Sequence, residues 1–212
     1  MAYLALVRHG QSEWNVKNWW TGLTDIGLTE IGIQEAKSAG EHVKDIRFDI
    51  AFTSVLLRAK ETWKYMQTEI LTKEILTIEN AALNERDYGD LTGKDKWKIR
   101  EEYGEEQFLK WRRGWDTPPP NGESLKDVYS RLIPYFESTI IPQLKEEKNV
   151  IIVAHGNSLR ALVKYLENIS DEIIPSLEIA TGEIYLYQID KDGKVVSKEI
   201  RKAANLHIPT KT

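Results

Sequence analysis

Two histidines of this chain stand at the ends of strongly apolar segments, and a glycine follows each of them. His9 comes after the run at 2–7, with Arg8 beside it, and His155 comes after the run at 150–154. An imidazole can attack phosphorus as a nucleophile, and a guanidinium holds phosphate oxygens through paired hydrogen bonds while it keeps its charge. One histidine at a strand end is more often structural, but the repeated pattern favours a shared site for an anion.

The apolar segments before these histidines must position them. Short runs rich in valine and isoleucine are typical of buried strands in a parallel sheet. Ligands bind such sheets beyond the carboxyl ends of the strands, where helix N-termini present free N–H groups to anions. We therefore expect the two imidazoles to flank one pocket, and the glycine after each lets the backbone come close to the ligand.

Two further charged residues fall at the same edge of the predicted sheet. Arg58 lies in the first turn of a helix after the second strand, and Glu85 lies in the loop after the third. Taken singly, each is more often a solvated surface residue. With His9 and His155 they would bring four separate segments to one crevice.

The rest of the chain alternates strand and helix patterns. Ser124 caps a helix that extends towards residue 147, and Pro134 and Pro142 are expected to interrupt or kink it. This alternation predicts an α/β fold, a three-layer sandwich with a mainly parallel central sheet, helices on both faces and an antiparallel edge at a C-terminal hairpin. The expected strands lie at 2–8, 48–53, 75–79, 150–154, 183–189 and 195–200, and the other expected helices at 29–44, 56–70 and 157–168.

The segment at about 80–122 differs from its surroundings. It is rich in charge, tryptophan and glycine, ends in three prolines followed by Asn-Gly, and predicts two short helices at 94–102 and 105–113. Long excursions in compact domains are usually functional. We expect residues 1–212 to form one domain in which this segment covers the active edge.

Composition limits the classes of function. The chain has 212 residues, a formal charge of −4 and no cysteine, which excludes disulfides and thiolate chemistry within it. No apolar stretch approaches the roughly 20 residues of a membrane helix, and an acidic chain is a poor partner for nucleic acid. Met1-Ala2-Tyr3 runs directly into a strand, so we expect no secretory signal and a cytoplasmic protein that binds neither membrane nor nucleic acid.

Motifs from the first strand to the C-terminal hairpin resemble those of the cofactor-dependent phosphoglycerate mutases, a family of the histidine phosphatase superfamily. Arg-His-Gly alone indicates only the superfamily, whereas Glu-Arg-x-Tyr-Gly and Trp-Arg-Arg-Gly are more particular to the mutases. The motifs are Leu6-Val7-Arg8-His9-Gly10-Gln11-Ser12-Glu13-Trp14-Asn15, Trp20-Thr21-Gly22, Thr53-Ser54, Arg58-Ala59, Leu83-Asn84-Glu85-Arg86-Asp87-Tyr88-Gly89, Gly93 with Lys96, Trp111-Arg112-Arg113-Gly114, and Ala154-His155-Gly156-Asn157-Ser158-Leu159-Arg160.

The resemblance implies a phosphoryl transfer that interconverts 3-phosphoglycerate and 2-phosphoglycerate. His9 would be the nucleophile that carries the phosphoryl group, Arg8, Arg58 and His155 would surround that group, and Glu85 would act as acid and base. The cofactor would be 2,3-bisphosphoglycerate, which primes His9. Such a transfer depends on positioning and on cationic stabilisation of the phosphoryl oxygens, so arginines can supply the charge and no metal is expected.

The resemblance also implies contacts for a small anionic three-carbon acid that carries a phosphate. Arg112 and Arg113 would clamp its carboxylate or second phosphate, although without the resemblance two adjacent arginines are more often a solvated helix face. The oligomeric state stays open between monomer and homodimer. The other implied contacts are Gly10, Ser12, Asn15, Thr21, Gly22, Arg86, Tyr88, Lys96, Gly156 and Asn157.

The chain departs from longer members of the family in three places. It lacks an insertion after Pro120, only residues 201–212 follow the last strand as a cover for the site, and Asp87 stands where a neutral or basic residue is more usual. A shorter cover excludes water less well. We therefore expect some transfer of the phosphoryl group from 2,3-bisphosphoglycerate to water.

Three other functions remain open. A phosphomonoesterase of the same superfamily would keep the two histidines, Arg58 and Glu85 but would not depend on Arg112 and Arg113. A metal-dependent hydrolase with the histidines as ligands lacks further ligands at a recognisable spacing. A non-catalytic sensor of phosphorylated ligands would have little use for an intact Glu85. Nucleotide binding is disfavoured because no glycine-rich nucleotide fingerprint is present.

Overall fold

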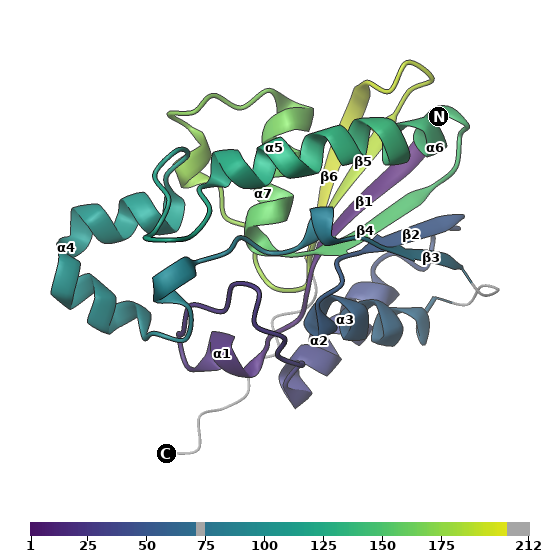
Figure 1. Ribbon diagram of the computed structural model, residues 1–212. Helices are drawn as coiled ribbons and strands as arrows, with labels where there is room; N and C mark the ends of the chain where they lie inside the picture. Colours follow the sequence, from purple (N-terminus) through teal and green to yellow (C-terminus); the bar gives the residue numbers. More distant parts are fainter. Residues whose placement is uncertain (71–74, 203–212) are drawn as a thin grey trace.

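A six-stranded sheet forms the centre of the molecule, in the order β3-β2-β4-β1-β5-β6 (Figure 1). The computed structural model describes residues 1–70 and 75–202, so nearly all of the expected cover at 201–212 lies outside the described part. The strands are β1 Ala2–Arg8, β2 Ile50–Thr53, β3 Leu76–Glu79, β4 Val150–Ala154, β5 Glu183–Ile189 and β6 Val195–Lys202.

The sheet is parallel in its centre and antiparallel at one edge. β1 pairs with β4, β4 with β2 and β2 with β3 in parallel, whereas β5 runs antiparallel to β1 and β6 antiparallel to β5. A turn at 190–193 joins β5 to β6, and Gly193 adopts φ +83° there, a conformation that glycine reaches without steric cost. The predicted fold class and its antiparallel C-terminal edge are confirmed.

Helices cover both faces of the sheet (Figure 1). Successive side chains of a strand point to opposite faces, so Leu4 and Leu6 of β1 pack into one core and Ala5 and Val7 into another. The first core takes up α5, α6 and α7, and the second takes up α2 and α3. These helices are α2 Glu30–Glu41, α3 Leu57–Gln67, α5 Leu125–Tyr135, α6 Ile141–Lys145 and α7 Gly156–Glu167.

The helix predicted after Ser124 is divided into three pieces. Ser124 caps α5, a π-helical turn occupies 136–140, and α6 follows. Pro134 lies inside α5, where it removes a backbone donor, and Pro142 lies in the first turn of α6, where the missing N–H costs little. The interruption expected from the two prolines is therefore present as a π turn between them.

The segment at 80–122 stands to one side of the sheet (Figure 1). It contains 3₁₀ turns at 81–83 and 89–91 and the helix α4 Lys96–Arg113, which breaks at Gly104 (φ 81°, ψ 162°). The two halves of α4 correspond to the two short helices predicted at 94–102 and 105–113. A separate small core fixes α4 against the loop after β1, and its buried members are Trp20, Leu91, Ile99, Phe108 and Trp111.

One short helix was not expected. α1 Glu13–Val16 begins after Ser12 and spans a single turn in the tryptophan-rich loop that follows β1. Of the described helices, none is long and apolar enough to cross a lipid bilayer.

Candidate active site

β1 and β4 are neighbours in the sheet, and they place the two histidines side by side. Arg8 is paired with Ala154, and the backbone N–H of His9 donates to the carbonyl of Ala154 at 3.0 Å, so both strands end at the same level. The ring centroids of His9 and His155 are 5.0 Å apart, with an angle of 58° between the ring planes. The two imidazoles are therefore close enough to contact one bound oxyanion.

His9 is buried and holds a defined tautomer. Burial, followed by the charges of Arg58 and Arg8, lowers the pKa of His9 well below its usual 6.5, so the free imidazole is neutral near pH 7. Its Nδ1 lies 2.7 Å from the carbonyl oxygen of Gly10. Because a carbonyl can only accept, the proton sits on Nδ1, and Nε2 keeps the lone pair that a nucleophile needs.

Ser54, the first residue after β2, orients His155. Its Oγ lies 2.7 Å from Nε2 of His155 and also accepts the backbone N–H of Leu56 at 3.2 Å. The hydroxyl proton is then free to reach Nε2, which favours the imidazole proton on Nδ1. That Nδ1 is buried and has no acceptor among the described residues. Burial and the charge of Arg58 lower the pKa of His155 well below 6.5, as for His9.

Arg58 reaches both histidines from the first turn of α3. Its side chain is only 1% exposed, and it donates to the carbonyls of Thr24 at 2.9 Å and Gly22 at 2.8 Å. Its Nε has no acceptor among the described residues. Because carbonyls hold this buried cation and no carboxylate within residues 1–70 and 75–202 bonds to it, its charge is available for an anion.

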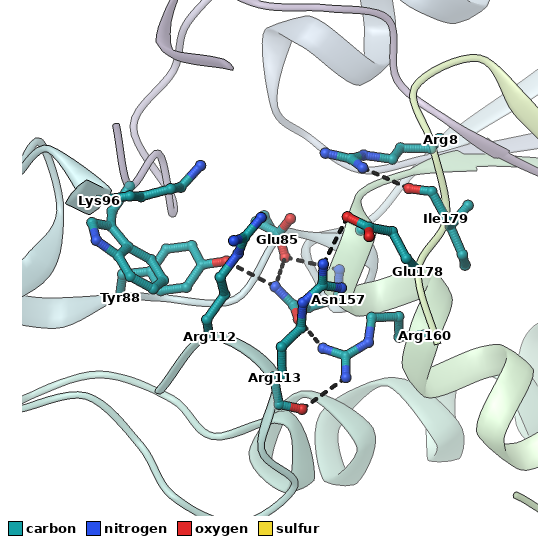
Figure 2. Close-up of a pocket in the computed structure, with 12 residues that line it drawn as sticks. Arg8, Glu85, Tyr88, Lys96, Arg112, Arg113, Asn157, Arg160, Glu178 and Ile179 are labelled. Carbon is teal, nitrogen blue, oxygen red and sulfur yellow. Dashed lines mark hydrogen bonds and ion pairs between the residues drawn. The ribbon is translucent and has the colours of Figure 1, made fainter. Parts of the chain in front are cut away.

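Glu85 approaches from the loop after β3, on the α7 side of the site. Its Oε1 accepts the backbone N–H of Arg86 at 2.8 Å, and the backbone and side-chain amides of Asn157 at 3.2 and 3.0 Å. Asn157 Nδ2 also donates to the Tyr88 hydroxyl at 2.9 Å (Figure 2). These donors converge on one carboxylate oxygen, which leaves Oε2 to exchange a proton with a ligand.

A cavity opens in front of these residues, and positive charge dominates its wall. Figure 2 shows side chains from β1, the segment at 80–122, α7 and the segment before β5 converging on it. Five lining residues are cationic and two are acidic, whereas the whole chain carries a formal charge of −4. The cavity thus gathers cations in an acidic protein. The lining residues are Arg8, Trp20, Glu85, Tyr88, Lys96, Arg112, Arg113, Gly156, Asn157, Arg160, Glu178 and Ile179.

The cations of α4 repel one another in the cavity. Burial, followed by the charge of Arg112, lowers the pKa of Lys96 to about 8. Burial and the neighbouring charge of Arg113 also lower the pKa of Arg112. A bound anion would relieve this repulsion and restore the charged forms.

Eleven of the seventeen predicted site residues lie at the cavity or beside it. Three of them, His9, Arg58 and His155, are buried next to the cavity and do not line it. His9 follows the lining residue Arg8, and His155 precedes the lining residue Gly156. The charge of Arg58 acts on both imidazoles. The other eight line the cavity itself, namely Arg8, Glu85, Tyr88, Lys96, Arg112, Arg113, Gly156 and Asn157.

The remaining six predicted contacts do not line the cavity, and three of them make local structural contacts. Arg86 is fully buried and donates to the carbonyls of Trp111 and Arg112, so it fixes the C-terminal end of α4. Ser12 bonds to the side chain of Asn15 at the start of α1. As substrate contacts these residues stay predictions, as do Gly10, Thr21 and Gly22.

The structure brings five residues to the site that were not among the predicted site residues, although three of them, Trp20, Ser54 and Arg160, lie within the motifs. Arg160 lies one helical turn after Asn157, and its NH1 donates to the Asn157 side chain at 2.9 Å, so the i, i+3 spacing on α7 could have indicated it. Ser54 and Trp20 are motif residues to which no role in the site was assigned. Glu178 and Ile179 come from irregular chain between α7 and β5, and no local pattern points to them.

The fold and the paired histidines with their arginines define the class of protein. The chain matches the model of the histidine phosphatase superfamily, branch 1, over residues 4–200, and it belongs to that superfamily. Among its curated relatives, the 2,3-bisphosphoglycerate-dependent phosphoglycerate mutase of Parvibaculum lavamentivorans is 52% identical over 199 residues, which cover 93% of this chain and 95% of that protein. A protein of the same name from Brucella melitensis is 50% identical over 202 residues, with coverage of 94% and 98%. The resemblance seen in the sequence is confirmed.

Solved structures share the fold at lower identity. The mycobacterial glucosyl-3-phosphoglycerate phosphatase in complex with VO3 superposes with a TM-score of 0.82 at 24% identity, covering 96% of this chain and 100% of that one. Bacillus stearothermophilus YhfR gives a TM-score of 0.80 at 25% identity and covers 98% of both chains. The arrangement of sheet and helices is thus that of the superfamily.

Proposed function

We propose that this protein is an isomerase that interconverts 3-phosphoglycerate and 2-phosphoglycerate through a phosphohistidine at His9, with 2,3-bisphosphoglycerate as cofactor. The observation that carries the proposal is the pair of buried imidazoles, 5.0 Å apart, behind a cavity with an excess of cationic side chains. Relatives about half identical over nearly the whole chain bear the name of this activity.

The cofactor carries three anionic groups, and the residues at the site fit such a ligand. Buried N–H groups of Arg8, Arg58 and His155 lack acceptors among the described residues, so a phosphoryl group at that place would satisfy them. Lys96, Arg112 and Arg113 would hold the other anionic groups. When bound, 2,3-bisphosphoglycerate supplies the phosphoryl group that His9 carries.

The transfer needs a nucleophile, an acid and a base. Nε2 of His9 bonds to phosphorus as the bond from phosphorus to the departing oxygen breaks, and Glu85 gives that oxygen a proton. In the return step Glu85 takes the proton of the one free hydroxyl of a bound phosphoglycerate, whose oxygen attacks the phosphorus on His9 as the bond from phosphorus to Nε2 breaks. His9 then takes the phosphoryl group from the other position, and Glu85 returns its proton to the oxygen that departs. Arg8, Arg58 and the Nδ1–H of His155 stabilise the charge on the equatorial oxygens throughout.

Arg112 and Arg113 separate this proposal from a phosphatase on the same scaffold. Replacing both with glutamine removes the clamp for the carboxylate but leaves the histidines intact. We expect kcat/KM for 3-phosphoglycerate to fall by about 100-fold or more, given that each charge-assisted contact contributes about 1.5–3 kcal/mol. Cleavage of p-nitrophenyl phosphate should change by less than about fivefold, since its ring makes no bidentate contact with guanidinium. An equal loss of both activities would favour a phosphomonoesterase.

Several further features belong to the same proposal. The protein acts in the cytoplasm as one domain, with 80–122 as the cover of the site, and its arginines take the part that a metal ion plays in other phosphoryl transfers. Among the described residues no group of three or more His, Cys, Asp or Glu side chains lies close enough to hold a metal ion. Full activity in the presence of EDTA is the expected result, and a loss that Mg²⁺ restores would contradict it.

A further inference from the structure

The cavity wall contains a carboxylate that the proposed chemistry does not use. Glu178 lies between the 3₁₀ turn at 174–176 and β5, and its Oε1 is 2.7 Å from NH2 of Arg113 (Figure 2). The next residue, Ile179, accepts a hydrogen bond from the guanidinium of Arg8 at 2.5 Å. Two successive residues of one segment therefore engage an arginine from β1 and an arginine from α4.

Glu178 and a substrate carboxylate are chemically the same kind of partner for Arg113. Burial raises the pKa of Glu178, but the hydrogen bond and the charge of Arg113 lower it by more. The net pKa therefore lies below its usual value, and the side chain is charged near neutral pH. One guanidinium edge cannot pair with two carboxylates at once. A ligand that uses this edge of Arg113 must replace Glu178.

The ion pair is placed so that replacement is easy. The Glu178 side chain is 62% exposed and that of Arg113 is 22% exposed. Partly exposed pairs of this kind contribute little to stability, about 0–1 kcal/mol. Glu178 can turn into solvent and stay hydrated, whereas Arg113 remains at the wall.

We propose that Glu178 is a specificity-determining residue that occupies Arg113 in the free protein and gives it up only to a ligand with a second anionic group. A phosphoester that has no second anionic group cannot replace the Glu178 carboxylate on Arg113, and it gains no contact with Arg113. An acid that carries both phosphate and carboxylate exchanges one carboxylate for another. This inference rests on the proposed function, because it assigns the second anionic group to Arg113.

Two ligands that differ only at the far end test the inference. 3-Phosphoglycerate and glycerol 3-phosphate share the phosphate and the hydroxyl, but one has a carboxylate where the other has a CH2OH group. Titration calorimetry with the full chain, without 2,3-bisphosphoglycerate, measures each Kd for the unchanged protein and for Glu178→Gln. We expect Glu178→Gln to tighten 3-phosphoglycerate by about two- to fivefold, the size of one partly exposed ion pair. The Kd of glycerol 3-phosphate, which has no carboxylate to exchange with Glu178, should stay nearly the same.

Matched variants distinguish the release of Arg113 from the loss of one negative charge elsewhere on the protein. Glu172→Gln removes the same charge from an exposed position outside the cavity, and it should leave both Kd values unchanged. In an Arg113→Gln background the effect of Glu178→Gln on 3-phosphoglycerate should vanish, because the two residues act through one contact.

Four results would overturn the inference. They are an equal change for both ligands, no change, weaker binding of 3-phosphoglycerate by Glu178→Gln, and an effect that persists with Arg113→Gln. These titrations need no turnover, so assaying the unchanged chain for interconversion tests the proposed function separately. A chain without mutase activity could still show the exchange at Arg113, and an active mutase could lack it.

Discussion

Several guanidinium groups at the site keep one buried N–H without an acceptor in the described part of the chain, although their other N–H groups donate to carbonyl or amide oxygens. Nε of Arg8, Arg58 and Arg160 is buried and has no acceptor among the described residues. Unsatisfied buried donors of charged groups cost free energy in the absence of a ligand. The site is thus built for an anion before the anion arrives, and both histidines are neutral until it does.

Lys96 should make the binding of an anion at the cavity depend on pH. Its pKa is lowered to about 8 in the free protein, so its charge is lost as pH rises through that value, and a bound anion would raise the pKa again. Binding of 3-phosphoglycerate should therefore weaken between pH 7 and 9, and its Kd should rise by about three- to tenfold if one charge contact is lost. Lys96→Arg keeps its charge over this range, and its Kd should be nearly flat across that interval. Equal slopes for lysine and arginine would show that another group titrates.

Strands and long helices were predictable because their cause is local. Short apolar runs predicted β1 and β4, and helical spacing predicted α2 and α3, with ends displaced by a few residues. α1 has one turn and no periodicity, so nothing in its own sequence distinguished it from a loop.

The site was predictable to the extent that its residues adjoin strand ends or motifs. Glu178 could not be anticipated, because its role depends on how the segment before β5 crosses towards α4. Arg86, which is predicted to contact substrate, is also buried under the end of α4, a position that only tertiary packing decides.

A close backbone approach joins α2 to the loop after β1. A Cβ on Gly32 would collide with the backbone carbonyl of Gln11, and a Cβ on Gly10 would collide with the carbonyl of Gly32. Gly32→Ala should therefore lower the free energy of unfolding by about 1–3 kcal/mol through overpacking, although Gly32 lies off the cavity wall. Urea unfolding measures the change. Gln34→Ala, at an exposed position of the same helix, should stay within about 0.5 kcal/mol, and a neutral Gly32→Ala would refute the close approach.

The whole molecule combines a net negative charge with a cationic cavity. The cavity attracts a small anion, and the negative charge of the chain repels polyanions from the remaining surface. Sulfate should therefore stabilise the native state by mass action. At 100 times its Kd the gain is about 2.7 kcal/mol, or a rise in Tm of roughly 5–10 °C for a chain of this size. Sodium chloride at equal ionic strength is the control in the thermal scan, and an identical rise with chloride would argue against a specific anion site.

The nucleophile assigned to His9 is the claim on which the mechanism depends. The protein is incubated with ³²P-labelled 2,3-bisphosphoglycerate in the presence of EDTA, and the modified residue is located by mass spectrometry under conditions that preserve acid-labile phosphate. We expect one labelled residue, His9, and transfer of that label to added 3-phosphoglycerate. Label on any other residue, or a His9→Asn variant that is labelled to the same extent, would contradict it.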